Sequence, residues 1–348
     1  MPAPFSTLVL DLHNTLYDEA LEYGLSLDEA VTAWREIAKA HGHAVEAEVL
    51  YGELSAAHRK LGSDWDTDAW RMLPSLAKLN LPEDEFDNAL RKGEALRKRK
   101  SRELVESNGY EGMRETLAAL KAQGVPVYVV TEAAADAGME ILSWLKLGGI
   151  VDGFYSWPSR VPPQVIEGTY HKPFPAKTSG GHLKKPHPLV LAAVVLDEAV
   201  RRKLISPEIQ IKDVFEIAYE KGLSLAELPA DAPAQQDIGT QLIIQPTPYA
   251  TALKQIMDGM LYVGDSKFKD GLLARNAGVA FGWAAYGKKI KPGNEDLHRK
   301  SIAIMYAVTG WEPEELKLTQ EAGKSATVAA LQPHHVFAHT LAEALNLF

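Results

Sequence analysis

Three apolar runs of the sequence end in side chains that could do chemistry. Asp11 follows TLVL, Thr131 ends VPVYVVT, and Asp265 follows GMLYVG. The carboxyl ends of parallel strands meet at one edge of a sheet, so three polar strand ends together favour a site over simple turn formation. The chain contains no cysteine, which excludes thiolate ligands, cysteine nucleophiles and disulfides. Carboxylate, histidine and hydroxyl chemistry remain.

The elements that must position these residues alternate between strands and helices. Continuous apolar runs predict buried strands, and amphipathic segments that end at glycine predict helices between them. Strands are expected at 7–12, 125–131, 150–157, 259–266 and 279–284, helices at 112–124, 135–149, 189–203 and 269–278, and a last strand and helix within 334–348. We therefore predict an α/β fold, a doubly wound and mostly parallel sheet with helices on both faces.

A different pattern interrupts this alternation early in the chain. Residues 18–107 are rich in Ala, Leu, Glu and Lys at helical spacing, which predicts an inserted α-helical domain. The α/β core is then 1–17 and 108–348, with insertions at about 205–245 and 288–330. The Pro/Gly-rich stretch 157–181 is expected to lack regular structure.

Bulk properties narrow the class of protein. A chain of 348 residues with 46% hydrophobic and 24% charged residues is typical of a globular protein with two domains. Its formal charge of −9 argues against a nucleic-acid or anionic-membrane partner, and the basic run 90–102 is interpreted as a solvated helix face. Without a signal-peptide pattern or a long apolar span, we expect a cytoplasmic protein of unknown oligomeric state.

Four short motifs carry a resemblance to a known family. The segment Asp11-Leu12-His13-Asn14-Thr15 resembles motif one of the haloacid-dehalogenase-like (HAD-like) superfamily, in which a strand ends in Asp-x-Asp-x-Thr. Thr131 resembles motif two, Lys185 in Lys-Pro-His-Pro motif three, and Gly264-Asp265-Ser266 with Asp270 motif four. In this family a helical cap often lies between motifs one and two, where 18–107 is found. The resemblance implies a HAD-like core, Rossmann-type in architecture, with a cap domain.

The resemblance also implies a metal-dependent phosphatase mechanism. Asp11 would be the nucleophile that forms an aspartyl-phosphate intermediate, and Mg²⁺ would bring the anionic phosphate to it. Asp11 and Asp265 would supply carboxylate ligands, and His13 its backbone carbonyl. Asp270 would be an auxiliary acid that orders Lys185 or a metal-bound water, with a place in a first helical turn as the alternative.

The remaining motif residues would bind the phosphate. Thr131 would donate a hydroxyl hydrogen bond and Lys185 an ammonium group, with Glu132 beside them in the substrate site. Lys172 in Lys-Pro-Phe-Pro fits the same short pattern, but an apolar helix follows Lys185 and a Gly/Ser-containing loop follows Lys172. We therefore prefer Lys185. The predicted activity is hydrolysis of a small phosphorylated metabolite, a phosphoric monoester.

One catalytic position departs from the family pattern. Where the family has an Asp that protonates the leaving oxygen and then activates water, this chain has His13. Imidazole can do both at near-neutral pH, but the side chain could instead be a bystander. A second reading is therefore a phosphate-binding or regulatory protein that has lost turnover. A third is a haloacid dehalogenase, which uses the first Asp without a metal.

Overall fold

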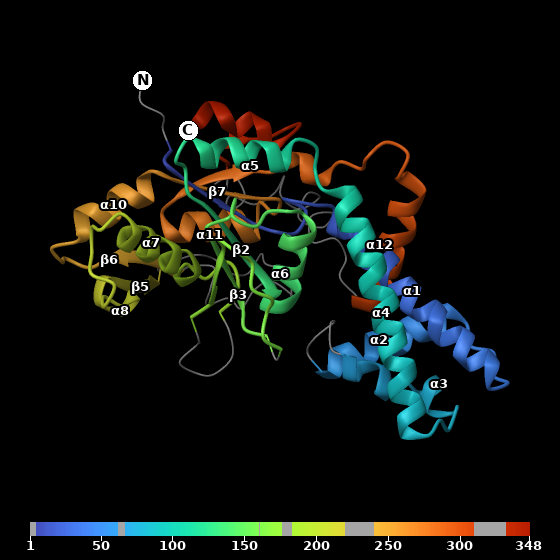
Figure 1. Cartoon of the computed structure of the whole chain (residues 1–348). Helices are drawn as coiled ribbons and strands as arrows, with labels where there is room; N and C mark the ends of the chain where they lie inside the picture. The colour runs from blue at the N-terminus through green and yellow to red at the C-terminus, as the bar shows by residue number, and fades with distance from the viewer. Residues whose placement is uncertain (1–4, 62–66, 160, 176–182, 220–239, 310–331) are drawn as a thin grey trace. The chain divides into compact units, whose positions relative to one another are not determined.

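Seven parallel strands form one sheet within the described part of the computed structural model (Figure 1). The structure describes residues 5–61, 67–159, 161–175, 183–219, 240–309 and 332–348. The strand order is β4-β3-β2-β1-β7-β8-β9. Their bounds are β1 Thr7–Leu10, β2 Val127–Ala134, β3 Gly153–Trp157, β4 Tyr170–Pro173, β7 Met260–Gly264, β8 Ala280–Trp283 and β9 His335–Val336. The predicted parallel sheet is confirmed.

Helices cover both faces of this sheet, as predicted. On one face lie α7 (Leu189–Arg201), α10 (Ala250–Asp258) and α11 (Lys269–Ala277), which share a core with Tyr128 and Tyr262 of the sheet (Figure 1). On the other face, α5 (Met113–Ala122) packs on β2, and α6 (Ala135–Trp144) packs on β2 and β3. The architecture is therefore the doubly wound α/β fold.

The central strands form where the sequence has its continuous apolar runs. All four residues of β1 and all five of β7 are buried, as expected of parallel strands covered on both faces. The two strands are neighbours, with Leu10 opposite Val263. The chain leaves β1 for β2 on one side and returns to β7 on the other. The order of strands thus reverses between β1 and β7, which is where such sheets bind ligands.

Several elements of the core differ from the sequence predictions. The stretch expected to be irregular, 157–181, contains the edge strand β4. The insertion at 205–245 contains the short helix α8 (Ile211–Val214) and an antiparallel pair, β5 (Phe215–Tyr219) with β6 (Thr240–Ile244). Its tip, 220–239, lies outside the described residues. The last predicted helix is a 3-10 helix, η4 (Leu341–Leu347).

Of the described residues, 18–61, 67–108 and 290–309 form a separate compact unit. Its elements are α1 (Glu19–Ala40), α2 (Ala47–Leu61), η1 (Thr67–Met72), α3 (Pro74–Ala77), α4 (Glu83–Asn108) and α12 (Glu295–Thr309). Trp34 lies at the centre of its core, stacked on Trp70 at 6.0 Å between ring centroids and close to Phe86 at 5.0 Å. The described part of the predicted insertion between β1 and β2 therefore contains helices and no strand, and it has a core of its own.

One segment of this unit comes from far along the sequence. Sequence analysis assigned 288–330 to an insertion of the α/β core, whereas α12 packs against α1. A Cβ atom at Gly24 of α1 would lie 2.2 Å from the backbone oxygen of Ser301 in α12, so the two helices cross in close contact. The Ser301 hydroxyl also donates to the carbonyl oxygens of Ala20 and Leu21. Residues 310–331 lie outside the described part of the chain.

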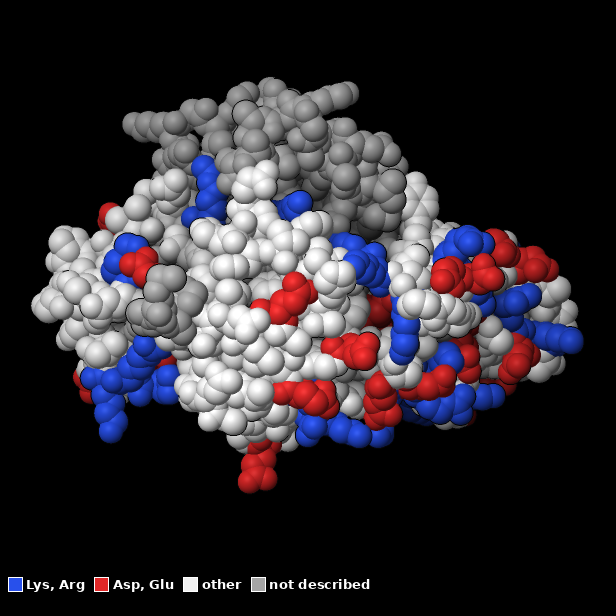
Figure 2. Space-filling view, turned by 90° about the horizontal axis from the view of Figure 1, so that it is seen from above, with Lys and Arg blue, Asp and Glu red and all other residues white. Residues whose placement is uncertain are grey.

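The basic run in α4 is neighboured by acidic side chains. Lys100 pairs with Glu103 at 2.7 Å and Arg102 with Glu106 at 2.8 Å. On the face shown in Figure 2, acidic and basic side chains lie side by side over the helical unit that contains α4. Most of the run thus lies on a solvated helix face of mixed charge, whereas Arg97 is buried. Among the described residues, no helix combines the length and the apolar character that a membrane span needs.

Candidate active site

The site is built at the carboxyl ends of the two central strands. Asp11 follows β1 and Asp265 follows β7, the neighbouring strands between which the strand order reverses. The backbone N–H of Asp11 donates to the carbonyl of Val263 at 2.8 Å, so the pairing of β1 with β7 fixes the backbone position of Asp11. Both side chains are almost fully buried, at 10% exposed. The topology therefore brings together two acids that are far apart in the sequence.

Lys185 is the cation at the centre of this site. Its Nζ donates to Asp11 Oδ1 at 2.6 Å and to Asp270 Oδ1 at 2.9 Å, and the side chain is only 4% exposed. Burial opposes the charge of the lysine, but Asp11 and Asp270 outweigh burial and raise the pKa of Lys185 well above its ordinary value. Lys185 is therefore a fixed ammonium group that joins motif one to motif four. The Lys185–Pro186 peptide bond is cis.

Asp270 is held in place by three donors. Besides Lys185, the hydroxyl of Tyr262 donates to Oδ1 at 2.7 Å and the backbone N–H of Ser266 to Oδ2 at 3.1 Å. A Cβ atom at Gly264 would lie 2.3 Å from Cγ of Asp270, so only glycine lets this carboxylate lie against the end of β7. The predicted role of Asp270, ordering Lys185, fits this geometry. Tyr262 was not predicted as part of the site.

Asp265 is also bound on its outer side. Lys288, at the end of the 3-10 helix η3 (Ala285–Lys288), places Nζ 2.5 Å from Oδ2 of Asp265. The indole N–H of Trp283 donates to the backbone carbonyl of Asp265 at 2.9 Å. Sequence analysis did not identify Lys288, because no motif marks a lysine that follows the strand after motif four.

Three carboxylates of the site suit a divalent cation. Asp11, Asp265 and Asp270 each offer an oxygen within 4.8 Å of the others. Against these three acids stand two ammonium groups, those of Lys185 and Lys288. Burial, with the nearby acids, raises the pKa of Asp11 to about 7, although Lys185 opposes this rise. The site thus holds more negative charge than its lysines balance, and hard carboxylate oxygens are ligands that Mg²⁺ prefers.

In the second predicted motif, Glu132 connects to the loop of motif three, next to Thr131. Thr131 is fully buried within β2, and its hydroxyl accepts a hydrogen bond from the backbone N–H of Ala133 at 3.2 Å. The carboxylate of Glu132 accepts the backbone N–H of Lys185 at 2.8 Å. Glu132 therefore ties the end of β2 to the loop that carries the lysine. Contact of Thr131 or Glu132 with a substrate stays a prediction.

The competing lysine lies elsewhere in the fold. Lys172 belongs to the edge strand β4 and pairs with Asp197 of α7, with half of its own side chain exposed. Lys185, in contrast, contacts Asp11 directly. The structure thus brings the preferred lysine, and not its competitor, to the predicted nucleophile.

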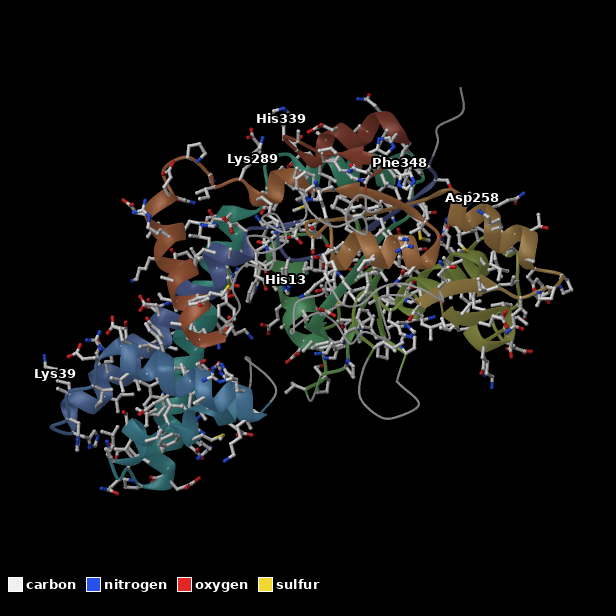
Figure 3. The ribbon with its side chains drawn as sticks, turned by 180° about the vertical axis from the view of Figure 1, so that it is seen from behind. His13, Lys39, Asp258, Lys289, His339 and Phe348 are labelled. Carbon is white, nitrogen blue, oxygen red and sulfur yellow. The ribbon has the colours of Figure 1, made fainter. Side chains whose placement is uncertain are left out.

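His13 is the second residue after the predicted nucleophile, Asp11. It comes from the loop directly after β1 (Figure 3), and its ring packs edge-on against Tyr17 at 5.8 Å between centroids. The side chain is half-buried, and its charge acts to lower the pKa of Asp11. The imidazole is therefore within electrostatic range of Asp11, which leaves both the acid–base and the bystander interpretations in place.

The chain matches no family model, and no curated protein matches it by sequence. Solved structures do match. The chain is similar to HAD-superfamily hydrolases. One is a 2-haloacid dehalogenase from Pseudomonas syringae, with 14% identity, a TM-score of 0.43 and coverage of 88% of this chain and 100% of that one.

Two further similar structures carry other descriptions. A phosphoglycolate phosphatase predicted in Haemophilus somnus shares 18% identity at a TM-score of 0.36, over 82% of this chain and 88% of that one. A HAD hydrolase from Bacillus subtilis bound to magnesium shares 14% identity at a TM-score of 0.35, over 88% and 99%. All three similarities are at low identity.

Proposed function

We propose that the protein is a HAD-like, magnesium-dependent hydrolase of a small-molecule phosphomonoester and that Asp11 is its nucleophile. The observation that carries this proposal is the buried cluster of Asp11, Asp265 and Asp270 at the point where the strand order reverses, with Lys185 bound between Asp11 and Asp270. Such a cluster suits the positioning and charge neutralisation that phosphoryl transfer requires.

The residues of the site would divide the reaction into two displacements. The carboxylate of Asp11 attacks phosphorus, the ester P–O bond breaks, and the leaving oxygen takes a proton. Water then attacks the aspartyl phosphate and releases inorganic phosphate. Lys185, held between Asp11 and Asp270, neutralises charge on the carboxylate and the phosphoryl oxygens. Bound to Asp11, Asp265 and the backbone carbonyl of His13, Mg²⁺ would neutralise further charge.

His13 is the proposed acid and base. As imidazolium it would protonate the leaving oxygen, and as neutral imidazole it would remove a proton from the attacking water. Its place after β1, within electrostatic range of Asp11, supports this role. The same substitution also supports the second candidate, a protein that binds phosphate but does not hydrolyse it. A dehalogenase is disfavoured, because it uses the first Asp without a metal and would not need Asp265 and Asp270 grouped beside Asp11.

The proposed partner is a small phosphorylated metabolite in a cytoplasmic setting. The formal charge of −9 gives no general attraction to nucleic acid or an anionic membrane. The position of the helical unit between motifs one and two supports its assignment as a cap.

A screen of phosphorylated metabolites, with Mg²⁺ and with a chelator, tests the proposal. The wild type should release phosphate from at least one substrate only with Mg²⁺. Asp11→Asn should abolish that release, because it removes the nucleophile without changing the shape of the side chain. Near-wild-type turnover by Asp11→Asn would rule out the mechanism. Phosphate binding without release would favour the second candidate.

A further inference from the structure

Lys288 stands out among the residues around the site because no motif includes it. Its ammonium nitrogen lies 2.5 Å from Asp265 Oδ2, and its side chain is 36% exposed, against 10% for the aspartate. The lysine therefore contacts a proposed metal ligand from the open side of the carboxylate. In contrast, Lys185 is buried on the inner side, between Asp11 and Asp270.

The backbone that carries Lys288 is held firmly against the loop after β1. The hydroxyl of Tyr286 donates to the carbonyl of Thr15 at 2.8 Å, and a Cβ atom at Gly287 would lie 1.8 Å from the carbonyl oxygen of Asn14. The hydroxyl of Tyr110 donates to the carbonyl of Gly287 at 3.1 Å. The backbone position of Lys288 is thus fixed, while its side chain is 36% exposed.

The charge balance gives this lysine a function. When all three carboxylates are ionised, Lys185 and a bound Mg²⁺ together carry three positive charges, which balance Asp11, Asp265 and Asp270 and leave none for a phosphate dianion. Lys288 supplies one more positive charge at the same place. The same ammonium group must repel a cation that binds to Asp265, since it occupies one of the carboxylate oxygens.

We propose that Lys288 is a further binding residue of the site, which strengthens the binding of the phosphate dianion and weakens the binding of Mg²⁺. This inference rests on the proposed function and deepens it. In this proposal a Mg²⁺ ion bound to Asp265 would compete with Lys288 for that carboxylate, and the displaced ammonium group would bind the phosphate dianion.

The test measures two affinities by titration calorimetry, without any turnover. Mg²⁺ alone is titrated first, and inorganic phosphate is then titrated into the protein saturated with Mg²⁺. The variants are Lys288→Met, Lys288→Arg, which keeps the charge, and Lys289→Met. Lys289 (labelled in Figure 3) is the matched control, because it is an exposed lysine of the same segment outside the site.

The two affinities should move in opposite directions in Lys288→Met. Mg²⁺ should bind about tenfold more tightly and phosphate about tenfold more weakly, the scale of one partly screened charge interaction at this separation. Lys288→Arg and Lys289→Met should stay close to the wild type in both titrations.

Other outcomes would overturn the inference in recognisable ways. Weaker binding of both Mg²⁺ and phosphate by Lys288→Met would show that Lys288 only holds Asp265 in its orientation. Unchanged affinities would show that its contact with Asp265 has no part in binding. If the wild type binds Mg²⁺ and releases phosphate from a substrate, these results remove only the role of Lys288. If it does neither, the proposed function itself fails.

Discussion

Replacing Lys185 with methionine removes the one ammonium group that lies between Asp11 and Asp270. Lys185 is 4% exposed, and the side chains of Asp11 and Asp270 are 10% and 2% exposed. Methionine keeps the length and most of the volume of lysine, so the change removes charge rather than packing. Two buried carboxylates are then left facing each other without the cation that both contact.

The size of the effect follows from the burial. Breaking a buried ion pair by removing one partner costs about 3–5 kcal/mol, because the remaining charge stays out of water. The loss should be smaller below about pH 6 than above about pH 8, because the raised pKa of Asp11 rises further without Lys185 and a protonated carboxyl needs no counter-ion. Mg²⁺ should restore part of the stability, since it binds the folded site.

Urea titration followed by hydrogen exchange in β1 and β7 measures the stability of the α/β core itself. The matched control is Lys172→Met. That lysine is 51% exposed and pairs with Asp197, so its loss should cost no more than about 1 kcal/mol. If Lys185→Met were no more destabilising than Lys172→Met in the presence of a chelator, the buried charge network would not exist as described.

Substitutions at two other positions test the remaining roles. Asp265→Asn should weaken Mg²⁺ binding about tenfold or more, as measured by calorimetry, since it removes a charged ligand; an unchanged titration would exclude Asp265 as a ligand. His13→Ala should lower turnover by roughly 10²-fold, the scale of a lost acid–base group, while His13→Asp should keep or raise it. If neither change alters turnover, His13 is a bystander. If the wild type is inactive and only His13→Asp is active, the site has lost its catalytic acid.

The core strands were predictable because burial on both faces leaves a continuous apolar run. This holds for β1 and β7. The edge strand β4, with the sequence YHKP, has mostly exposed residues and a proline, so nothing in its pattern separates it from a loop. The packing of α12 on α1 depends on the contact of Gly24 with Ser301, which no local periodicity reports.

The site shows the same division between local and long-range information. Asp11, Asp265 and Lys185 stand at strand ends or in short motifs, and the topology brings them together. Tyr262 contacts Asp270 from within an apolar strand, where a tyrosine has the pattern of an ordinary core residue. Lys288 meets Asp265 from 23 residues away, through a turn that only the folded chain positions.

The most direct test of the mechanism is to trap the intermediate on Asp11. A substrate identified in the screen would be mixed with the enzyme and Mg²⁺, quenched in acid during turnover and reduced with borohydride, which converts an aspartyl phosphate to homoserine. Mass spectrometry of the peptide that contains residue 11 should find homoserine at Asp11 in the wild type and none when substrate is omitted. Turnover with unmodified Asp11, or with the modification on another carboxylate, would contradict the proposed mechanism.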